Sequence, residues 1–143
     1  MSAALEHAKK LLAARERTEA QLRAALERRR YEADEIDRAI ERLKALRFLD
    51  DRRAAEAHAR VALTAKQSRA AVTRKLASMG VADSEAEAAV ARVGEEVGHH
   101  DETAARALLT KRRLSGVKAA RFLAGRGFDE ALIVKLVPEV AED

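Results

Sequence analysis

The sequence predicts an all-α protein of three tandem three-helix repeats, stacked into an elongated, curved rod. Three windows, Thr18 to Ile40, Ser68 to Val90 and Ser115 to Val137, align without a gap at offsets of 50 and 47 residues. A period of this length indicates stacked supersecondary units. Hydrophobic residues make up 48% of the chain but aromatic residues only 3%, and small aliphatic side chains favour closely packed helices. With one proline and six glycines in 143 residues, long loops are not expected.

The aligned windows share hydroxyl and apolar residues at matching positions. Each opens with a Ser or Thr that can cap a helix, has a leucine eight positions later, and has apolar residues 13 and 22 positions after its start. These residues are Thr18, Leu26, Tyr31 and Ile40 in the first window, Ser68, Leu76, Val81 and Val90 in the second, and Ser115, Leu123, Phe128 and Val137 in the third. The sequence therefore predicts repeats over residues 1–49, 50–97 and 98–143.

In the first repeat, apolar residues at helical spacing from Leu5 to Leu12 predict the first helix. Thr18 caps the second helix, and the third follows Tyr31. The residue before this turn is Arg30, where the other repeats have glycine. Because glycine forms a left-handed C-cap without strain, Arg30 must adopt that conformation at a cost or use a different cap. We predict a slightly different turn here.

The second repeat begins with two aspartates, Asp50 and Asp51, whose carboxylates suit the free N–H groups of a helix N-terminus. The apolar face of that first helix is predicted to include Ala54, Ala57 and Val61. Ser68 then caps the second helix, Gly80 ends it, and apolar residues from Ala86 to Val97 line the third; these last residues are Ala86, Ala89, Val90, Val93 and Val97.

The third repeat follows the same order. Apolar residues from Ala104 to Leu109 predict its first helix, Ser115 caps the second, and Gly127 ends it. Pro138 is expected to limit the last helix. Because helices of this length bury little alone, we expect stacking to give a continuous core, with contacts mainly between adjacent repeats.

The junction between the first two repeats resembles a known family. Residues 43–57 read LKALRFLDDRRAAEA, which is similar to the pattern L-x-x-L-G-x-L-D-D of the RecX family of recombinase regulators. The run from Arg15 to Leu26 and the turns Gly80-Val81 and Gly127-Phe128 also resemble that family, and the likeness extends over residues 4–140. The chain departs from the family pattern at Arg47, where the family has glycine, and at Ala54, where it has an aromatic residue. An aromatic is also missing near His58.

The resemblance implies a function in recombination, DNA repair and the SOS response. Proteins of this family bind the bacterial recombinase RecA and lie in the helical groove of the filament that RecA forms on single-stranded DNA. There they block filament extension, strand exchange and ATP hydrolysis. The resemblance implies no catalytic residue and no cofactor.

Basic residues recur at equivalent places in the repeats. The net charge is +4, and residues 1–49 contribute most of it, with 12 Lys and Arg against 9 Asp and Glu. A row of cations on successive repeats can follow a repeating anionic partner, such as a filament or a phosphate backbone. The alternative is ordinary solvated helix ends. The candidate partner-binding residues are Arg15, Arg17, Arg23, Lys66, Arg74, Lys75, Arg112, Arg113, Lys118 and Arg121.

Other polar clusters point to structural roles. The run Arg28-Arg29-Arg30-Tyr31 is typical of a solvated helix end, although it also suits nucleic-acid contact. His99-His100-Asp101 and Asp50-Asp51 are interpreted as capping or structural groups, because no cysteine or further ligand is near in sequence. There is no phosphate-binding glycine loop and no readable Ser-His-Asp arrangement. We expect neither an enzyme, nor a metal site, nor a cofactor.

No apolar run approaches the length of about 20 residues needed to cross a bilayer, and the N-terminal segment lacks a signal-peptide core. The absence of cysteine fits a reducing compartment. We therefore expect a soluble, cytoplasmic monomer that regulates RecA on single-stranded DNA, with at most weak binding to DNA alone. Two alternatives stay open: a general basic helical module that binds nucleic acid, and a protein-interaction scaffold with a different partner.

Overall fold

The computed structural model describes residues 2–141, and within them the chain forms nine α-helices and one 3-10 helix, with no strand. The all-α prediction is confirmed. The helices are α1 (Ala3–Ala14), α2 (Glu19–Arg28), α3 (Ala33–Ala45), α4 (Asp51–Thr64), α5 (Arg69–Ser78), α6 (Asp83–Val97), α7 (Asp101–Arg112), α8 (Gly116–Gly125) and α9 (Glu130–Leu136), followed by the 3-10 helix η1 (Pro138–Ala141).

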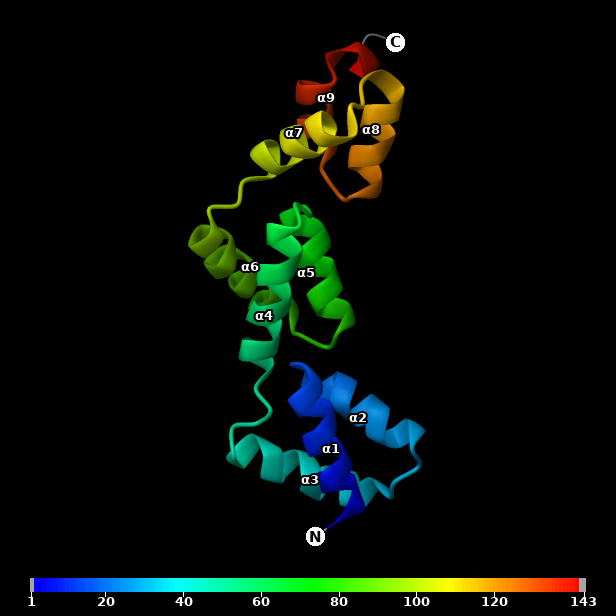
Figure 1. Ribbon diagram of the computed structural model, residues 1–143, viewed down its shortest axis with the longest axis vertical. Coiled ribbons are helices and arrows are strands. Elements are labelled where there is room, and N and C mark those ends of the chain that lie inside the picture. The colour runs from blue at the N-terminus through cyan, green and yellow to red at the C-terminus, as the bar shows by residue number, and fades with distance from the viewer. Residues whose placement is uncertain (1, 142–143) are drawn as a thin grey trace.

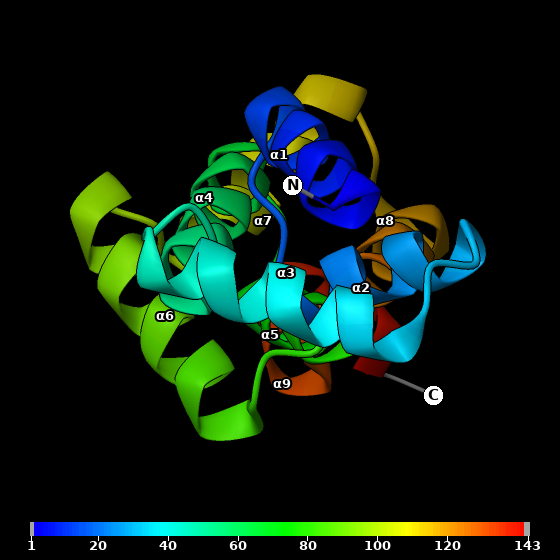
Figure 2. The same ribbon diagram turned by 90° about the horizontal axis from the view of Figure 1, so that it is seen from below.

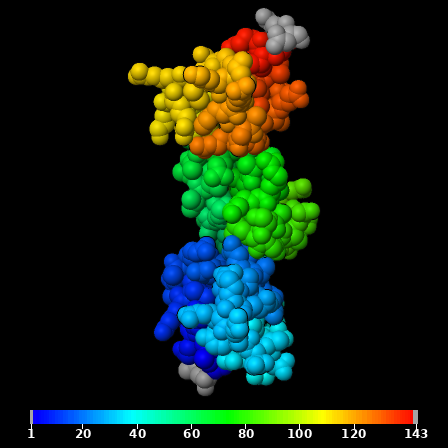
Figure 3. All heavy atoms as spheres, turned by 90° about the vertical axis from the view of Figure 1, so that its right-hand side faces the viewer, coloured from blue at the N-terminus to red at the C-terminus, as the bar shows by residue number. Residues whose placement is uncertain are grey.

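The helices come in groups of three that follow one another along an elongated, curved rod (Figure 1). The N-terminus lies at one end of the rod and the C-terminus at the other. The second helices of the groups, α2, α5 and α8, lie on the right-hand side in Figure 1, the side that Figure 3 turns toward the viewer. A view along the rod shows the three groups behind one another (Figure 2). The three-repeat architecture agrees with the sequence, while the division at residues 49 and 97 into domains stays a prediction.

The hydrophobic core is not continuous, so that part of the prediction is wrong. Three separate clusters form, each from the helices of a single group, around Leu26 and Ile40, around Leu76 and Val90, and around Leu123 and Phe128. In every pair of helices with extensive contact, both helices belong to the same group. Small alanine-rich faces on α4 and α7 let three short helices close around their own core. Each repeat is therefore packed by itself, and the joints between repeats are held differently.

Polar groups form the joints between repeats. The Thr18 hydroxyl accepts from the N–H of Gln21 at 3.1 Å, as a helix cap does, and donates to the carbonyl of Met79 in the next repeat. Thr18 is fully buried. Ser68 repeats this arrangement, accepting from Ala71 and donating to the carbonyl of Arg126 at 3.2 Å. One buried hydroxyl thus caps a helix and links two repeats.

A carboxylate completes each joint from the other side. Asp51 accepts from the backbone N–H of Glu19 at 2.7 Å, and Asp101 accepts from that of Arg69 at 3.0 Å. Asp50 caps its own helix through Arg53, as predicted. The prediction that Asp51 does the same is wrong, because its carboxylate reaches the first N–H of α2 instead. Asp51 and Asp101 thus each cap a helix of the preceding repeat.

Close packing at the joints explains why two of the three turns carry glycine. A Cβ atom on Gly80 would lie 2.4 Å from Cβ of Ala20, and one on Gly127 would lie 2.8 Å from Cβ of Ala71. Both glycines also have positive φ, +91° and +85°. Among residues 2–141 no other repeat packs against the turn at Arg30, which takes the left-handed conformation with φ of +63°. Its turn differs as predicted, because it lacks the bond that Val81 and Phe128 make from their N–H groups to the last helical turn.

The last repeat ends the array with a different joint. Ser115 occupies the N-cap position of α8, but its side chain makes no capping bond, so that prediction is wrong. Among residues 2–141 no carbonyl accepts from its hydroxyl. The N–H of Gly116 is instead bound by the carboxylate of Glu139 on η1 at 3.1 Å. Glu139 takes the place that Asp51 and Asp101 have at the inner joints.

One smaller expectation, for Val61, is wrong, and another, for Pro138, agrees with the structure. Val61 is 73% exposed rather than part of the apolar face of α4, which is formed by Ala54, Ala55, Ala59, Ala62 and Leu63. The helix is rotated because its small residues, rather than its β-branched one, fit against α6. Pro138 limits α9 as expected, since the helix ends at Leu136 and η1 begins at the proline.

Candidate functional site

The polar residues singled out from the sequence lie at joints between repeats and on exposed surfaces. In residues 2–141 no three His, Cys, Asp or Glu side chains are placed to hold a metal ion. His99, a candidate from sequence, is 6% exposed and bonds the carbonyl of Gln67 through Nε2 at 2.9 Å. Burial lowers its pKa, against the raising effects of the Gln67 carbonyl and of Asp101. His99 is a structural residue at the second joint. Across the same span, no helix has the length and apolar character needed to cross a membrane.

Two of the three candidate partner-binding residues of the first repeat already bind other residues of the chain. Arg23 forms an ion pair with Asp37 at 2.7 Å, and this hydrogen bond raises the pKa of its guanidinium. Arg17 is half-buried and donates to the Leu11 carbonyl, and burial lowers its pKa. Arg15 follows α1 and is exposed. Of the three, only Arg15 presents its charge without a partner among residues 2–141.

The second-repeat candidates are exposed, but they do not lie together. Lys66 ends α4 with φ of +71°. Lys75 lies on α5 and lowers the pKa of His58, after the larger effect of that ring's own burial. Arg74 leans toward the third repeat, because one of its guanidinium nitrogens lies 2.8 Å from where a Cβ of Gly127 would be. Arg74 therefore extends the basic surface of the third repeat.

The third-repeat candidates gather around one aromatic ring. The guanidinium carbon of Arg112 lies 4.7 Å from the centre of the Phe122 ring, and that of Arg126 lies 5.0 Å from it. Lys118, Phe122 and Arg126 follow one face of α8 at intervals of four residues. We name the cations of this surface the α8 basic cluster: Arg112, Arg113, Lys118, Arg121 and Arg126.

The α8 basic cluster keeps its charges free. Both ion pairs of the third repeat use Glu102, which binds Arg106 at 3.4 Å and Lys135 at 2.6 Å. No cation of the cluster has an ion pair among the described residues. Acidic groups gather instead at the start of α7 and in α9 and η1. The cluster is carried by α8, by the end of α7 and by the residue that follows α8 (Figure 1), and the Glu139 carboxylate of η1 meets the N-terminus of α8.

Comparison with known proteins finds RecX both by sequence and by fold. Residues 4–43 match the first three-helix domain of RecX. Over this first repeat the chain is similar to RecX. A crystal structure of regulatory protein RecX is 16% identical, with a TM-score of 0.74 over 95% of this chain and 70% of that one. The structure of RecX from Lactobacillus salivarius is 22% identical, with a TM-score of 0.69 over 96% of this chain and 94% of that one. Among curated protein sequences no match was found.

The RecX pattern at the first junction has a clear structural meaning in this chain. Arg47, which stands where the pattern has glycine, has φ of +61° and therefore takes the glycine conformation at a cost. Leu49 enters the first core at 4% exposure, and the two aspartates cap α4 and α2. The motif thus marks the joint between repeats.

Sequence reasoning missed several residues of these surfaces. Phe122 and Arg126 were not singled out as surface residues, although their spacing along the chain is helical. Phe48 was noted only as a letter of the junction motif, yet it is 51% exposed. The signal that was available in each case is the i, i+4 spacing or the position beside a left-handed turn.

Proposed function

We propose that this protein acts as RecX proteins do: it binds the filament that RecA forms on single-stranded DNA and limits ATP hydrolysis, strand exchange and filament extension. The RecX match supports this proposal most directly. The protein acts by occupying the filament groove, as a partner that binds and obstructs, and it has no catalytic step of its own.

The shape of the chain suits such a target. A rod of three repeats presents several surfaces in a row, and a filament presents the same subunit at regular intervals. The second helices, which carry half of the candidate cations, lie along one side of the rod. A rod that contacts neighbouring subunits at once holds them in one arrangement and opposes the movement that accompanies ATP turnover.

The α8 basic cluster supports the third repeat as the main contact with an anionic surface. An unpaired cation loses no internal ion pair when it binds, whereas Arg23 must give up Asp37. Arg112 and Arg126 are also positioned by Phe122, so less side-chain entropy is lost on binding. These charges raise the association rate and fix the orientation of the rod in the groove.

The test is the ATPase activity of RecA on single-stranded DNA with increasing amounts of this protein. Wild-type protein is expected to inhibit hydrolysis and strand exchange, and the Lys118→Glu/Arg121→Glu variant to inhibit at least about tenfold less well, since reversed charges repel the same anionic surface. Both positions are exposed, and Lys118 lies in the first turn of α8, where glutamate suits the helix dipole.

The matched control is Arg38→Glu/Arg42→Glu on α3, which makes the same change in charge at exposed sites of the first repeat. It is expected to inhibit nearly as well as wild type. Wild-type protein that leaves ATPase and strand exchange unchanged in molar excess would rule out the proposed function. Equal losses in both variants would show an effect of net charge alone.

A second candidate function, direct binding to DNA, is favoured by the same unpaired cluster. Direct DNA binding predicts that the protein binds single-stranded DNA strongly without RecA. It also predicts that this affinity falls steeply as the salt concentration rises. Phe122 is half-buried beneath two guanidinium groups and does not offer its face to a base. Contact with DNA would therefore be limited to phosphates. Fluorescence anisotropy of labelled DNA at several salt concentrations separates the two functions.

A further inference from the structure

Phe48 is an aromatic side chain held at the surface, with 51% of its area exposed. The other aromatic residues, Tyr31, Phe122 and Phe128, are buried or half-buried. Its neighbour Leu49 is 4% exposed and belongs to the first core. The turn thus puts one apolar side chain into the core and the next one into solvent. A large ring in solvent forgoes the hydrophobic gain of burial, which a partner can restore.

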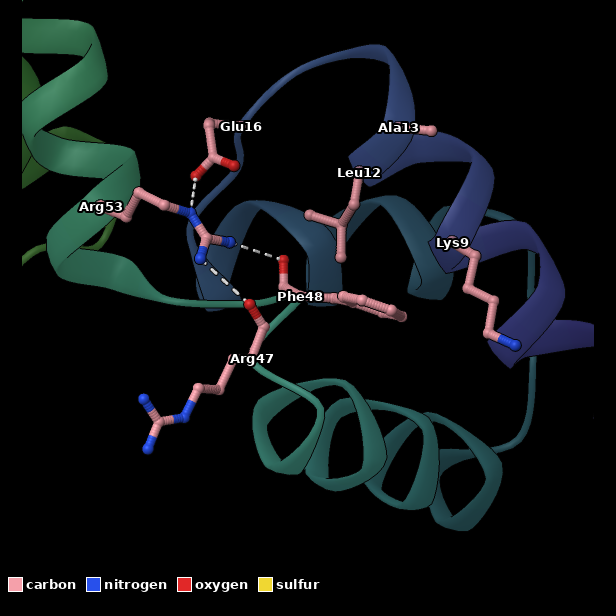
Figure 4. Close-up of a pocket in the computed structure, with 7 residues that line it drawn as sticks. All are labelled: Lys9, Leu12, Ala13, Glu16, Arg47, Phe48 and Arg53. Carbon is pink, nitrogen blue, oxygen red and sulfur yellow. Dashed lines mark hydrogen bonds and ion pairs between the residues drawn. The ribbon is translucent and has the colours of Figure 1, made fainter.

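The backbone that presents Phe48 is fixed on both sides. Its N–H donates to the carbonyl of Leu43 at 2.9 Å. The Arg53 guanidinium donates to the carbonyl of Phe48 at 3.0 Å and to that of Arg47 at 3.0 Å (Figure 4). A third bond ties Arg53 to the carboxylate of Glu16 at 2.8 Å. Because the turn is already ordered, a partner that binds Phe48 loses little free energy in ordering it.

Phe48 forms one wall of a groove between α1 and the turn that joins α3 to α4. The groove has a volume of about 470 Å³, and its floor is formed by Leu12 and Ala13 of α1, with charged groups at the edges (Figure 4). This volume is within the range of about 300–1,000 Å³ found for ligand pockets, and it suits one or two side chains. The lining residues are Lys9, Leu12, Ala13, Glu16, Arg47, Phe48 and Arg53.

The edges of the groove are predominantly basic. Glu16 is its one acidic lining residue, and its carboxylate is bound by Arg53. The guanidinium of Arg47 has no hydrogen bond or ion pair among residues 2–141. Arg47 also holds a left-handed conformation, φ of +61°, that glycine would adopt without strain. The linker over residues 46–50 is two residues longer than its counterpart over 98–100, and Phe48 lies within it.

We propose that this groove is a docking site for a protein segment that offers one large apolar side chain beside a carboxylate. The apolar side chain packs between Phe48 and Leu12, and the carboxylate meets Arg47. The assignment of that segment to RecA rests on the proposed function. An apolar floor with an aromatic wall favours a protein over a nucleic acid, because a phosphate backbone gains nothing from the floor. The rod then contacts protein at its first joint and the anionic surface at α8.

The first test measures binding of RecA, with and without single-stranded DNA, to immobilised wild-type protein and to Phe48→Ala. The expected result is a loss of affinity of about tenfold or more, as for an aromatic residue at the centre of an interface. The matched control is Val61→Ala, since Val61 is 73% exposed on α4 outside the groove. It is expected to bind as wild type does.

The second test separates docking from folding. Arg47→Gly relieves the backbone and removes the cation, so it is expected to raise the melting temperature and yet weaken binding. A merely structural role for this turn would move both quantities in the same direction. Phe48→Trp adds a lone tryptophan to a chain that has none. Its emission is expected to shift to the blue when RecA is added.

The outcomes are distinct. No binding of wild-type protein to RecA in any form would remove the proposed function and, with it, the assignment of the segment. Wild-type binding that Phe48→Ala leaves intact would overturn the docking site alone. Concentration-dependent self-association in sedimentation that Phe48→Ala abolishes would also overturn it, because the occupant would then be a second copy of the chain.

Discussion

Single residues at the joints carry more than one physical role. Gly80 was predicted as a helix C-cap, and its positive φ agrees with that. The structure adds that its missing side chain makes room for Ala20 of the preceding repeat. The first role could be predicted, because it depends on neighbours in sequence. The second depends on a residue 60 positions away, which no local pattern reveals.

Gly80→Ala is expected to destabilise the chain by about 2–4 kcal/mol, because a left-handed alanine and a steric clash add together. The measurement is urea denaturation followed by circular dichroism. Gly98→Ala is the matched control, since Gly98 also has positive φ, +69°, but nothing lies within 4 Å of an added Cβ. It should lose only the backbone contribution of about 1–2 kcal/mol. Equal losses would show that the clash is relieved without cost.

Ser68→Ala is expected to cost about 1–3 kcal/mol, because it removes a helix cap and leaves the carbonyl of Arg126 without its partner. Ser115→Ala makes the same chemical change at the equivalent position of the last repeat. Its hydroxyl makes no capping bond, so the cost should stay within about 0.5 kcal/mol. Thermal melts of the two variants compare them directly. Similar losses would contradict the double role of Ser68.

At the scale of helices, most of the fold could be predicted and the joints could not. Caps, left-handed turns and apolar spacing are local signals, and the helices follow them closely. The links between helices of different repeats join residues 58 and 61 positions apart, such as Ser68 with Arg126 and Thr18 with Met79. The core was predicted to be continuous because short helices bury little. Alanine-rich faces instead let each repeat close by itself.

The candidate site shows the same limit. Its basic residues could be named from sequence, because charge and spacing are visible there. Which of them are free depends on acids elsewhere in the fold. Arg23 is paired with Asp37 on α3, whereas no cation of the α8 basic cluster has an ion pair among residues 2–141. The available cations therefore differ from the predicted row.

The joint between the second and third repeats has a titratable residue, His99, at the position that the apolar Leu49 occupies in the first joint. His99 and Leu49 are both buried and stand directly before the N-caps of α7 and α4. The ring faces the Gln67 carbonyl and Asp101, whose carboxylate lies 3.8 Å away, and the Arg69 guanidinium binds the His99 carbonyl. Burial lowers the pKa of His99 from its ordinary value of 6.5. The neutral ring is therefore the form that fits this joint.

Stability is expected to fall with acidification through this residue. Because the folded pKa is lowered, the unfolded chain binds more protons, so the contribution is complete above pH 6.5 and is lost as pH falls through the folded pKa. Urea midpoints at pH 7.5 and pH 5.5 measure it. His99→Leu copies the first joint and should reduce the difference between the two midpoints. An unchanged difference would assign it to His7 or His58, whose pKa values burial also lowers.

At the scale of the whole molecule, three separate cores predict local rather than global responses to damage. Leu123→Ala removes a fully buried side chain from the third core and should cost about 2–5 kcal/mol there. Amide hydrogen exchange is expected to rise in α7, α8 and α9, while α1, α2 and α3 keep their protection. A uniform rise over all helices would show that the polar joints transmit stability as fully as a shared core does.

The two ends of the rod differ from its inner joints, and this bears on whether copies of the protein can join. A joint that uses one face of a repeat and the opposite face of the next is a head-to-tail contact, and such contacts polymerise without limit unless the ends differ. Arg30 replaces glycine on the face of the first repeat that would meet the third repeat of another copy. Glu139 already binds the N-terminus of α8, on the face of the third repeat that would meet the first repeat of another copy. A second copy therefore finds neither half of a joint. Arg30 and Glu139 therefore oppose head-to-tail joining of one copy of the chain to another.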